Sequence, residues 1–231
     1  DKIRGQEDLK QLRESIVNDR DPQRSCITVC CGTGCVAGGC NELAMAFEKE
    51  ILNQGLKDKI DLRRTGCHGF CERGPIVVIK PQGIFYQRSE QKDVAEIISK
   101  TVSGGEIIDR LLYSDPLTGE KIVYEKDVPF YKWQKRVVLG HNGEIDPTSI
   151  SDYIAIEGYQ ALATVLSEMT PEEVIAKVKS SGIRGRGGAG FLTGLKWELC
   201  RSALGDEKFI ICNADEGDPG AYMDRSILEG N

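Results

Sequence analysis

Two cysteine loops decide the fold of the first hundred residues: Val29-Cys30-Cys31-Gly32-Thr33-Gly34-Cys35 and Gly66-Cys67-His68-Gly69-Phe70-Cys71-Glu72-Arg73-Gly74-Pro75. Each loop follows a run of β-favouring or alternating residues, so each is expected at the end of a strand. The residues between the loops leave room for a helix and a strand. The pattern therefore predicts the order strand, helix, strand, β-hairpin and helix.

The boundaries of these elements follow from apolar spacing and from turn residues. The expected elements are an amphipathic helix within residues 5–20, a strand over 25–30, a helix with Asn41 as N-cap that ends at Gly55, a strand over 59–63, a hairpin over 76–86 and a helix over 91–101.

The paired thiols Cys30-x4-Cys35 and Cys67-x3-Cys71 predict a metal centre. Thiolates ligate both zinc and iron–sulfur clusters. Structural zinc commonly uses a C-x2-C knuckle, which both pairs lack, and the wider spacing favours a [2Fe–2S] cluster. A zinc site, catalytic thiols and merely buried thiols are the alternatives, and Cys31-x3-Cys35 is also geometrically possible.

Three other side chains near these loops are expected to be structural. Cys26 and Cys40 are interpreted as small buried residues. His68 lies between two ligands, and we expect an exposed loop imidazole rather than a metal ligand.

A glycine loop in the second half, Gly185-Arg186-Gly187-Gly188-Ala189-Gly190, contains the pattern G-x-G-x-x-G. A helix over 171–179, begun by the capping box of Thr170 and Glu173, precedes it where a dinucleotide fold has a strand. The glycines still allow a ligand to approach the backbone, and nearby cationic side chains suit phosphate. A flexible hinge is the alternative.

An acidic loop, Asn213-Ala214-Asp215-Glu216-Gly217-Asp218-Pro219-Gly220, follows a predicted buried strand over 208–212. Ligands of α/β sheets bind at the carboxyl ends of strands, and carboxylates there suit ribityl or ribose hydroxyls. A solvated acidic turn is the alternative.

Composition excludes several classes of protein. The 231 residues carry a net charge of −6, so no basic excess favours nucleic acid or an anionic membrane surface. The apolar runs have the length of strands, and we expect no membrane insertion. Seven of the nine cysteines lie between Cys26 and Cys71, which predicts a redox or metal protein of the reducing cytoplasm.

The quoted motifs resemble two known domains. The cysteine loops look like the thioredoxin-like [2Fe–2S] ferredoxin module, which implies the ligands Cys30, Cys35, Cys67 and Cys71. Residues 185–197 and the acidic loop resemble the flavin-binding core of the NADH-oxidising FMN and iron–sulfur subunit (51 kDa-like) of respiratory complex I and of soluble hydrogenases.

The second resemblance implies a set of cofactor-binding residues. FMN would be held by Gly185, Arg186, Gly187, Lys196, Asn213, Asp215 and Glu216, and NAD(H) would face Gly188, Phe191 and Asp218, with Gly190 in the same loop. The sequence departs from that family at Leu192, where proline is usual, and at Asp218, where glutamate is common.

Together these resemblances imply an α/β amino-terminal fragment of a flavoprotein subunit with a fused ferredoxin domain. We expect this domain over 1–102, a linker over 103–135, and the first part of a Rossmann-like FMN-binding domain over 136–231. The implied function is electron transfer between NAD(P)H, FMN and iron–sulfur clusters, as in the beta subunit of soluble NAD(P)-linked or electron-bifurcating [FeFe] hydrogenases or in an NADH dehydrogenase.

The implied partners are a hydrogenase or dehydrogenase catalytic subunit and a small [2Fe–2S] subunit, with a [4Fe–4S] cluster in the missing carboxyl-terminal part. The fragment alone is expected to be inactive and to bind FMN weakly. A stand-alone [2Fe–2S] carrier, a formate dehydrogenase diaphorase and a zinc-stabilised interaction domain are the alternatives.

Overall fold

The computed structural model describes residues 2–231, which divide into two compact units. The first, the cysteine-loop unit, contains residues 16–156 and 215–231. The second, the glycine-loop unit, contains the residues up to Ser15 and residues 157–214.

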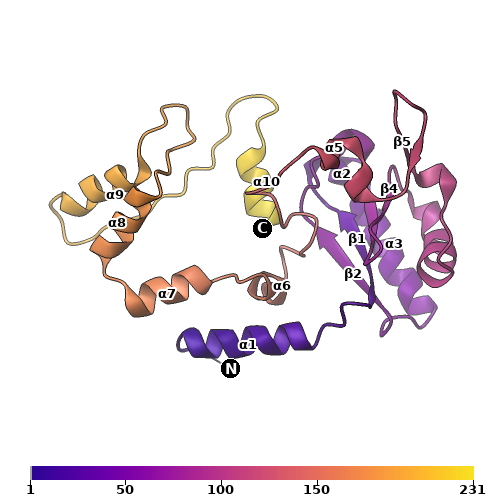
Figure 1. Cartoon of the computed structure of the whole chain (residues 1–231), viewed down its shortest axis with the longest axis horizontal. Helices are drawn as coiled ribbons and strands as arrows, with labels where there is room; N and C mark the ends of the chain where they lie inside the picture. Colours follow the sequence, from indigo (N-terminus) through magenta and orange to yellow (C-terminus); the bar gives the residue numbers. More distant parts are fainter. Residues whose placement is uncertain (1) are drawn as a thin grey trace. The chain divides into compact units, whose positions relative to one another are not determined.

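The cysteine-loop unit is built on a four-stranded mixed sheet in the order β2-β1-β3-β4 (Figure 1). The strands are β1 (Ser25–Cys30), β2 (Ile60–Thr65), β3 (Val77–Lys80) and β4 (Ile84–Tyr86). β1 runs parallel to β2 and antiparallel to β3, and β3 and β4 form a hairpin. Gly83 closes that hairpin with a φ of 77°, a conformation that favours glycine. The predicted strands and hairpin are confirmed.

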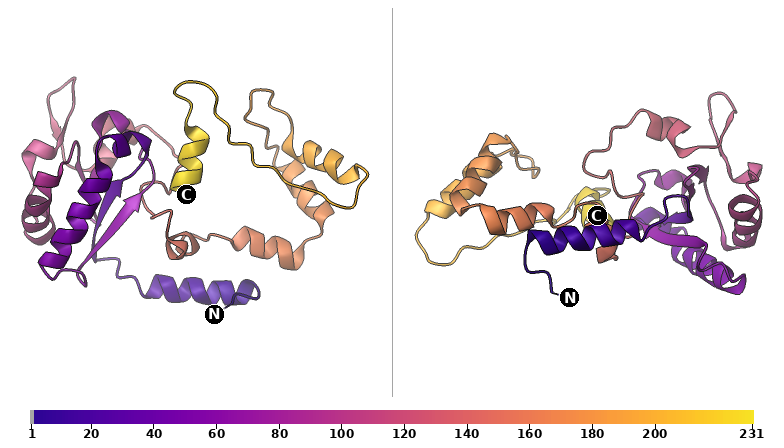
Figure 2. Two further views of the ribbon diagram at one scale, coloured as in Figure 1. Left: turned by 180° about the vertical axis from the view of Figure 1, so that it is seen from behind. Right: turned by 60° about the horizontal axis from the view of Figure 1, so that its bottom comes forward.

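Helices pack around this sheet. They are α2 (Thr33–Ala37), α3 (Cys40–Asn53) and a helical segment over 91–103 that contains α4 (Val94–Glu96). α3 contacts β1 and β2 and runs along the sheet (Figure 2). The predicted N-cap Asn41 is wrong. Gly39, with a φ of 86°, occupies that position and Asn41 lies inside the first turn, because the left-handed glycine redirects the chain between α2 and α3.

Residues 106–132, which we call the strap, continue the core of this unit. Their short elements are the 3₁₀ turn Asp109–Leu111, β5 (Tyr113–Ser114), β6 (Lys121–Ile122), the 3₁₀ turn Glu125–Asp127 and α5 (Pro129–Lys132). Ile108, Leu111, Val128 and Tyr131 are buried in the same apolar cluster as the sheet. The backbone N–H of Phe85 donates to the carbonyl of Val123 at 2.8 Å. Apolar residues of the predicted linker therefore pack into the core, while most of its other residues are exposed.

Two more helices complete the unit, α6 (Ile150–Ala155) and α10 (Met223–Gly230). Within α6, the carboxylate of Asp152 accepts a hydrogen bond from Arg20 Nη2 at 2.6 Å. The start of α10 is stabilised by Glu216, whose carboxylate accepts from the backbone N–H groups of Asp224 at 2.9 Å and Arg225 at 3.2 Å. A carboxylate suits this position because the first N–H groups of a helix lack helical partners.

The glycine-loop unit consists of helices and connecting loops. Its helices are α7 (Gln160–Glu168), α8 (Pro171–Ser180), α9 (Thr193–Ser202) and the first part of α1 (Gln6–Asn18). α8 begins with the predicted capping box: Thr170 and Glu173 each bind the backbone N–H of the other. The amphipathic first helix and the helix before the glycine loop are confirmed.

The predicted strand over 208–212 does not form. Phe209, Ile210 and Ile211 are each at least 74% exposed, and no strand within residues 2–231 pairs with them. A strand needs a neighbour for its backbone N–H and C=O groups, so β-propensity alone does not produce one here.

Across residues 2–231, no helix combines the length and the apolar character required to cross a bilayer.

Candidate functional site

The parallel pairing of β1 and β2 brings the two cysteine loops together. Cys30, the last residue of β1, lies opposite Thr65, the last residue of β2. Both loops therefore leave the sheet at the same end. The first loop turns into α2, which carries Cys35, and the second leads through Cys67 to a 3₁₀ turn that begins at Cys71.

Three close approaches of glycine hold these loops against each other. A Cβ atom on Gly32 would lie 2.6 Å from the Cβ of Cys67. One on Gly34 would lie 2.9 Å from the Cβ of Cys71, and one on Gly74 would lie 2.6 Å from the sulfur of Cys35. Carbon atoms do not approach this closely in contact, so the two loops can meet only where side chains are absent.

The four predicted ligand thiols form a connected group. The sulfurs of Cys67 and Cys71 are 3.8 Å apart. A hydrogen bond with Cys35 raises the pKa of Cys30 to about 12, and the same bond lowers the pKa of Cys35. Hydrogen bonding with Cys30 raises the pKa of Cys67. Cys30 thus lies between Cys35 and Cys67 and links the two loops.

The spacing of the second pair fits one tetrahedral metal ion. Metal–sulfur bonds of about 2.3 Å place two sulfurs about 3.7 Å apart, close to the distance between Cys67 and Cys71. Within residues 2–231, no group of three or more His, Cys, Asp or Glu side chains has the arrangement that would hold a single metal ion. In a [2Fe–2S] cluster each iron takes two cysteine sulfurs, so such a pair would also fit one of its irons.

Backbone N–H groups point at the sulfurs. The N–H of Gly69 lies 3.3 Å from the sulfur of Cys67, and the N–H of His68 lowers the pKa of Cys30. Hydrogen bonds of this kind stabilise negative charge on sulfur, which is the means by which a protein raises the reduction potential of a cluster.

Cys31 is turned away from this group toward Cys40. A hydrogen bond with Cys40 lowers the pKa of Cys31 and raises the pKa of Cys40. Cys40 and Cys26 are buried, as predicted. Cys30 thus interacts with Cys35 and Cys67, whereas Cys31 interacts with Cys40.

His68 is buried, at 1% exposure, so the prediction of an exposed loop imidazole is wrong. Its Nε2 lies 2.8 Å from the hydroxyl of Thr65, and its Nδ1 lies 3.3 Å from a carboxylate oxygen of Glu125. Burial opposes the ionisation of Glu125, but the contact with His68 and the charges of Lys80 and Arg136 together outweigh it and hold the pKa of Glu125 below its ordinary value. The two ring nitrogens of His68 thus face Thr65 and Glu125, and the Nδ1 contact lacks hydrogen-bond geometry.

The strap also covers the second cysteine loop with aromatic rings. Phe70 stacks on Phe130 with ring centroids 4.4 Å apart and planes 5° apart. The ring of Tyr131 meets Phe70 edge-on at 5.9 Å. The sequence-based prediction missed Glu125 and Phe130 because it assigned them to a linker; the aromatic pair Phe130-Tyr131 was the available signal of a packed segment.

The predicted phosphate loop is a closed turn on the glycine-loop unit. The N–H of Gly185 donates to the carbonyl of Phe191 at 2.8 Å, and the N–H of Thr193 donates to the carbonyl of Ile183 at 3.0 Å. Gly188 and Gly190 have φ values of 98° and 61°, which favour glycine. The loop is thus preformed, and its predicted cofactor-binding residues are exposed: Gly185, Arg186, Gly187, Gly188 and Phe191.

The other predicted flavin and nucleotide residues fall in both units. Lys196 lies on α9, and Asn213 is also in the glycine-loop unit. Asp215, Glu216 and Asp218 are in the cysteine-loop unit, where Glu216 stabilises the start of α10.

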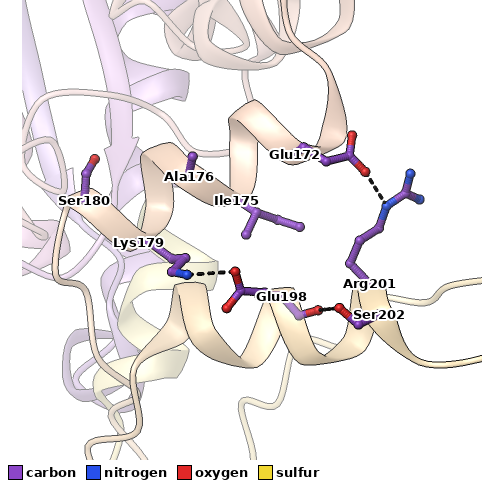
Figure 3. Close-up of a pocket in the computed structure, with 8 residues that line it drawn as sticks. All are labelled: Glu172, Ile175, Ala176, Lys179, Ser180, Glu198, Arg201 and Ser202. Atoms are coloured by element: carbon purple, nitrogen blue, oxygen red, sulfur yellow. Dashed lines mark hydrogen bonds and ion pairs between the residues drawn. The ribbon is translucent and has the colours of Figure 1, made fainter.

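Two hollows lie on the glycine-loop unit. The one between α8 and α9 measures about 910 Å³, and its charges pair with one another: Lys179 with Glu198 at 2.7 Å and Arg201 with Glu172 at 2.9 Å (Figure 3). None of the predicted cofactor-binding residues lines it. An apolar groove of about 630 Å³ is lined by parts of α7, α8, α9 and residues 208–211, and Lys196 lies at its wall.

Two segments of the chain match models of known protein families. Residues 15–102 match the family model of the thioredoxin-like [2Fe-2S] ferredoxin, and residues 178–231 match that of the Nuo51 FMN-binding domain.

Two curated relatives are named as subunits of oxidoreductases. The chain is 56% identical over 100 residues to the NADP-reducing hydrogenase subunit HndC of Solidesulfovibrio fructosivorans, and the match covers 43% of this chain and 20% of that protein. It is 52% identical over 93 residues to a subunit of the NADH-quinone oxidoreductase of Rhizobium meliloti (strain 1021), and the match covers 40% of this chain and 22% of that protein. The chain thus spans about a fifth of the length of these relatives.

Among solved structures, a thioredoxin-like [2Fe-2S] ferredoxin from Aquifex aeolicus is 31% identical to this chain and superposes with a TM-score of 0.37. The match covers 40% of this chain and 98% of the ferredoxin.

Proposed function

We propose that the chain is part of an electron-transfer flavoprotein subunit, because residues 15–102 match the thioredoxin-like [2Fe-2S] ferredoxin model and residues 178–231 match the Nuo51 FMN-binding domain model. This subunit moves electrons between NAD(P)H, FMN and iron–sulfur clusters. The relatives named as hydrogenase and NADH-quinone oxidoreductase subunits support this role. When bound, FMN would supply the chemistry that links a two-electron hydride to one-electron clusters.

The proposed cluster ligands are Cys30, Cys35, Cys67 and Cys71. The observation that carries this assignment is the connected group of these four thiols at the shared end of β1 and β2, with the sulfurs of Cys67 and Cys71 at 3.8 Å. The cluster would be a one-electron carrier when bound. The chain's own contribution is to hold the sulfurs in pairs and to direct N–H groups at them.

For FMN and NAD(H) we propose the residues of the closed glycine turn together with Lys196, Asn213 and the acidic loop. The preformed turn and its exposed backbone support phosphate binding there. The unpaired segment over 208–212 argues that this half is incomplete as a flavin site. The 231 residues alone therefore bind FMN weakly and do not oxidise NADH.

The domain division, the partners and the location are part of the same proposal. The ferredoxin domain extends over residues 1–102, and residues 136–231 belong to the flavin domain. The partners are the other subunits of a cytoplasmic hydrogenase or dehydrogenase. A second candidate is a stand-alone [2Fe–2S] carrier, which the well-packed core of the cysteine-loop unit favours.

The cluster assignment is tested by anaerobic reconstitution of the full chain with iron and sulfide, followed by iron analysis and EPR of the reduced protein. The expected result is two irons per chain and a reduced-state signal. Cys30→Ser should lose the cluster, whereas the matched Cys31→Ser should keep it. Equal iron contents in the two variants would reject the ligand assignment, and a colourless zinc-binding chain would reject the cluster.

Flavin binding by the same protein decides between the two candidate functions. Weak but saturable quenching of FMN fluorescence supports the flavoprotein assignment, with Lys196→Ala weakening it further. A chain that holds its cluster and shows no binding of FMN supports the stand-alone carrier.

A further inference from the structure

All three residues between Cys67 and Cys71 are contacted by the strap. His68 meets Glu125 at 3.3 Å, and a Cβ atom on Gly69 would lie 3.5 Å from the ring of Phe130. Phe70 stacks on the same ring at 4.4 Å. The strap thus meets His68 and Phe70 of the second cysteine loop and passes beside Gly69, which is exposed.

The strap is itself fixed to the core. Val128 is completely buried, and the ring of Tyr131 packs on Phe85 of β4 at 5.8 Å. The backbone N–H of Gln87 donates to the carbonyl of Leu111 at 3.0 Å. A segment held at both ends against a sheet can restrain a loop, whereas a solvated linker cannot.

The strap lies outside residues 15–102, the part of the chain that matches the ferredoxin family model. By contrast, the first loop is positioned from within that part, through the close approaches of Gly32 and Gly34 to the second loop. The two cysteine pairs therefore depend on different segments for their support.

We propose that the strap is a clamp for the cluster, in which Glu125 and Phe130 are positioning residues for the second cysteine pair. Glu125 contacts the imidazole of His68, and Phe130 stacks on the ring of Phe70. Together they keep the sulfurs of Cys67 and Cys71 at the spacing of one metal ion and shield the Phe70 side of the loop from water. This inference rests on the cluster assignment proposed above.

The clamp has two measurable consequences. Loosening the loop lets iron leave faster, because ligand spacing is no longer enforced. Admitting water, or removing the negative charge of Glu125, stabilises the more negative reduced cluster and raises its reduction potential. A role limited to general stability would change the first property and leave the second unchanged.

The experiment uses the full reconstituted chain and two pairs of matched variants. Glu125→Gln is paired with Asp127→Asn, which makes the same change of charge at an exposed residue of the same 3₁₀ turn. Phe130→Ala is paired with Tyr124→Ala, which removes a half-exposed strap aromatic that lies outside the stack on Phe70.

We expect Phe130→Ala to release iron to a chelator about two- to tenfold faster, the range given by the usual strength of an aromatic pair. Glu125→Gln should also release iron faster than wild type. Both should also have a less negative midpoint potential, while the two control variants behave as wild type. If Phe130→Ala fails to fold, Phe130→Leu keeps an apolar side chain without the ring stack and takes its place.

Unchanged release and potential in both test variants would overturn the clamp, as would equal changes in all four variants. If the wild-type chain binds no cluster, the cluster assignment fails first and the clamp fails with it. If the wild-type chain holds a normal cluster and both test variants match it in iron release and midpoint potential, only the clamp is refuted.

Discussion

Gly32→Ala is the substitution that tests the geometry of the cysteine loops most directly. The added Cβ atom would lie 2.6 Å from the Cβ of Cys67 and 2.8 Å from its Cα. Both of these atoms belong to the rigid part of Cys67, so no rotation of a side chain removes the clash. Either the two loops separate, or β1 and β2 shift at their shared end.

The size of the effect follows from overpacking. Forcing one extra carbon into a tightly packed site costs about 1–3 kcal/mol of stability. For a protein of this size that corresponds to a melting temperature lower by about 2–12 °C. The same displacement moves Cys67 relative to Cys30, so reconstituted iron should fall below two per chain, with the loss greater than the change in stability alone would cause.

The assay compares Gly32→Ala with Gly5→Ala by thermal unfolding and by iron content after identical reconstitution. Gly5 is a suitable control because a Cβ atom there would meet no atom within 4 Å. A Gly32→Ala chain with wild-type melting temperature and two irons would show that the loops do not approach as closely as described, and the argument for glycine at this position would fail.

Three further predictions concern the rest of the chain. Thr170→Ala should destabilise α8 by about 0.5–2 kcal/mol, measured by circular dichroism. The backbone N–H of Thr170 donates to the carboxylate of Glu173 and lowers its pKa, so this hydrogen bond should be present at neutral pH. Its contribution should be lost as the pH falls through the lowered pKa of Glu173. Gly194→Ala should separate α8 from α9, because its Cβ would lie 2.6 Å from the Cα of Lys179, and Lys179→Ala should not rescue it. Removal of iron by a chelator should lower the melting temperature of the cysteine-loop unit and leave α8 and α9 unchanged, as separate melting transitions would reveal.

The elements of the cysteine-loop unit could be predicted because each is determined locally. Strand periodicity, turn glycines and an apolar helical stripe gave the order of elements from β1 to the segment over 91–103. The convergence of the two loops also followed, since parallel neighbouring strands end at the same side of a sheet. The choice of Cys30 over Cys31 did not follow from spacing. It depends on the direction in which adjacent side chains leave the end of β1, and the contact of Cys31 with Cys40 supports the proposal of Cys30.

What the sequence did not reveal are contacts between segments far apart in the chain. The burial of His68 depends on Glu125, and the cover of Phe70 depends on Phe130. The polar turn residues of the strap near Leu117, which is 93% exposed, indicated a linker, although the flanking apolar residues pack into the core. Turn composition identifies where a chain bends, but it does not say whether the bend lies on a domain surface or between domains.

The strand predicted over 208–212 does not form because a partner strand is missing among residues 2–231. The residues Phe209-Ile210-Ile211 have strong β-propensity, yet propensity is the preference for a half-buried position beside another strand. Without that neighbour the backbone stays hydrated and the side chains stay exposed. The glycine turn over 183–193, by contrast, closes through its own hydrogen bonds. The turn proposed to bind phosphate can therefore form by itself, whereas the segment over 208–212 does not form its strand. This is the physical reason to expect FMN binding by these 231 residues to be weak.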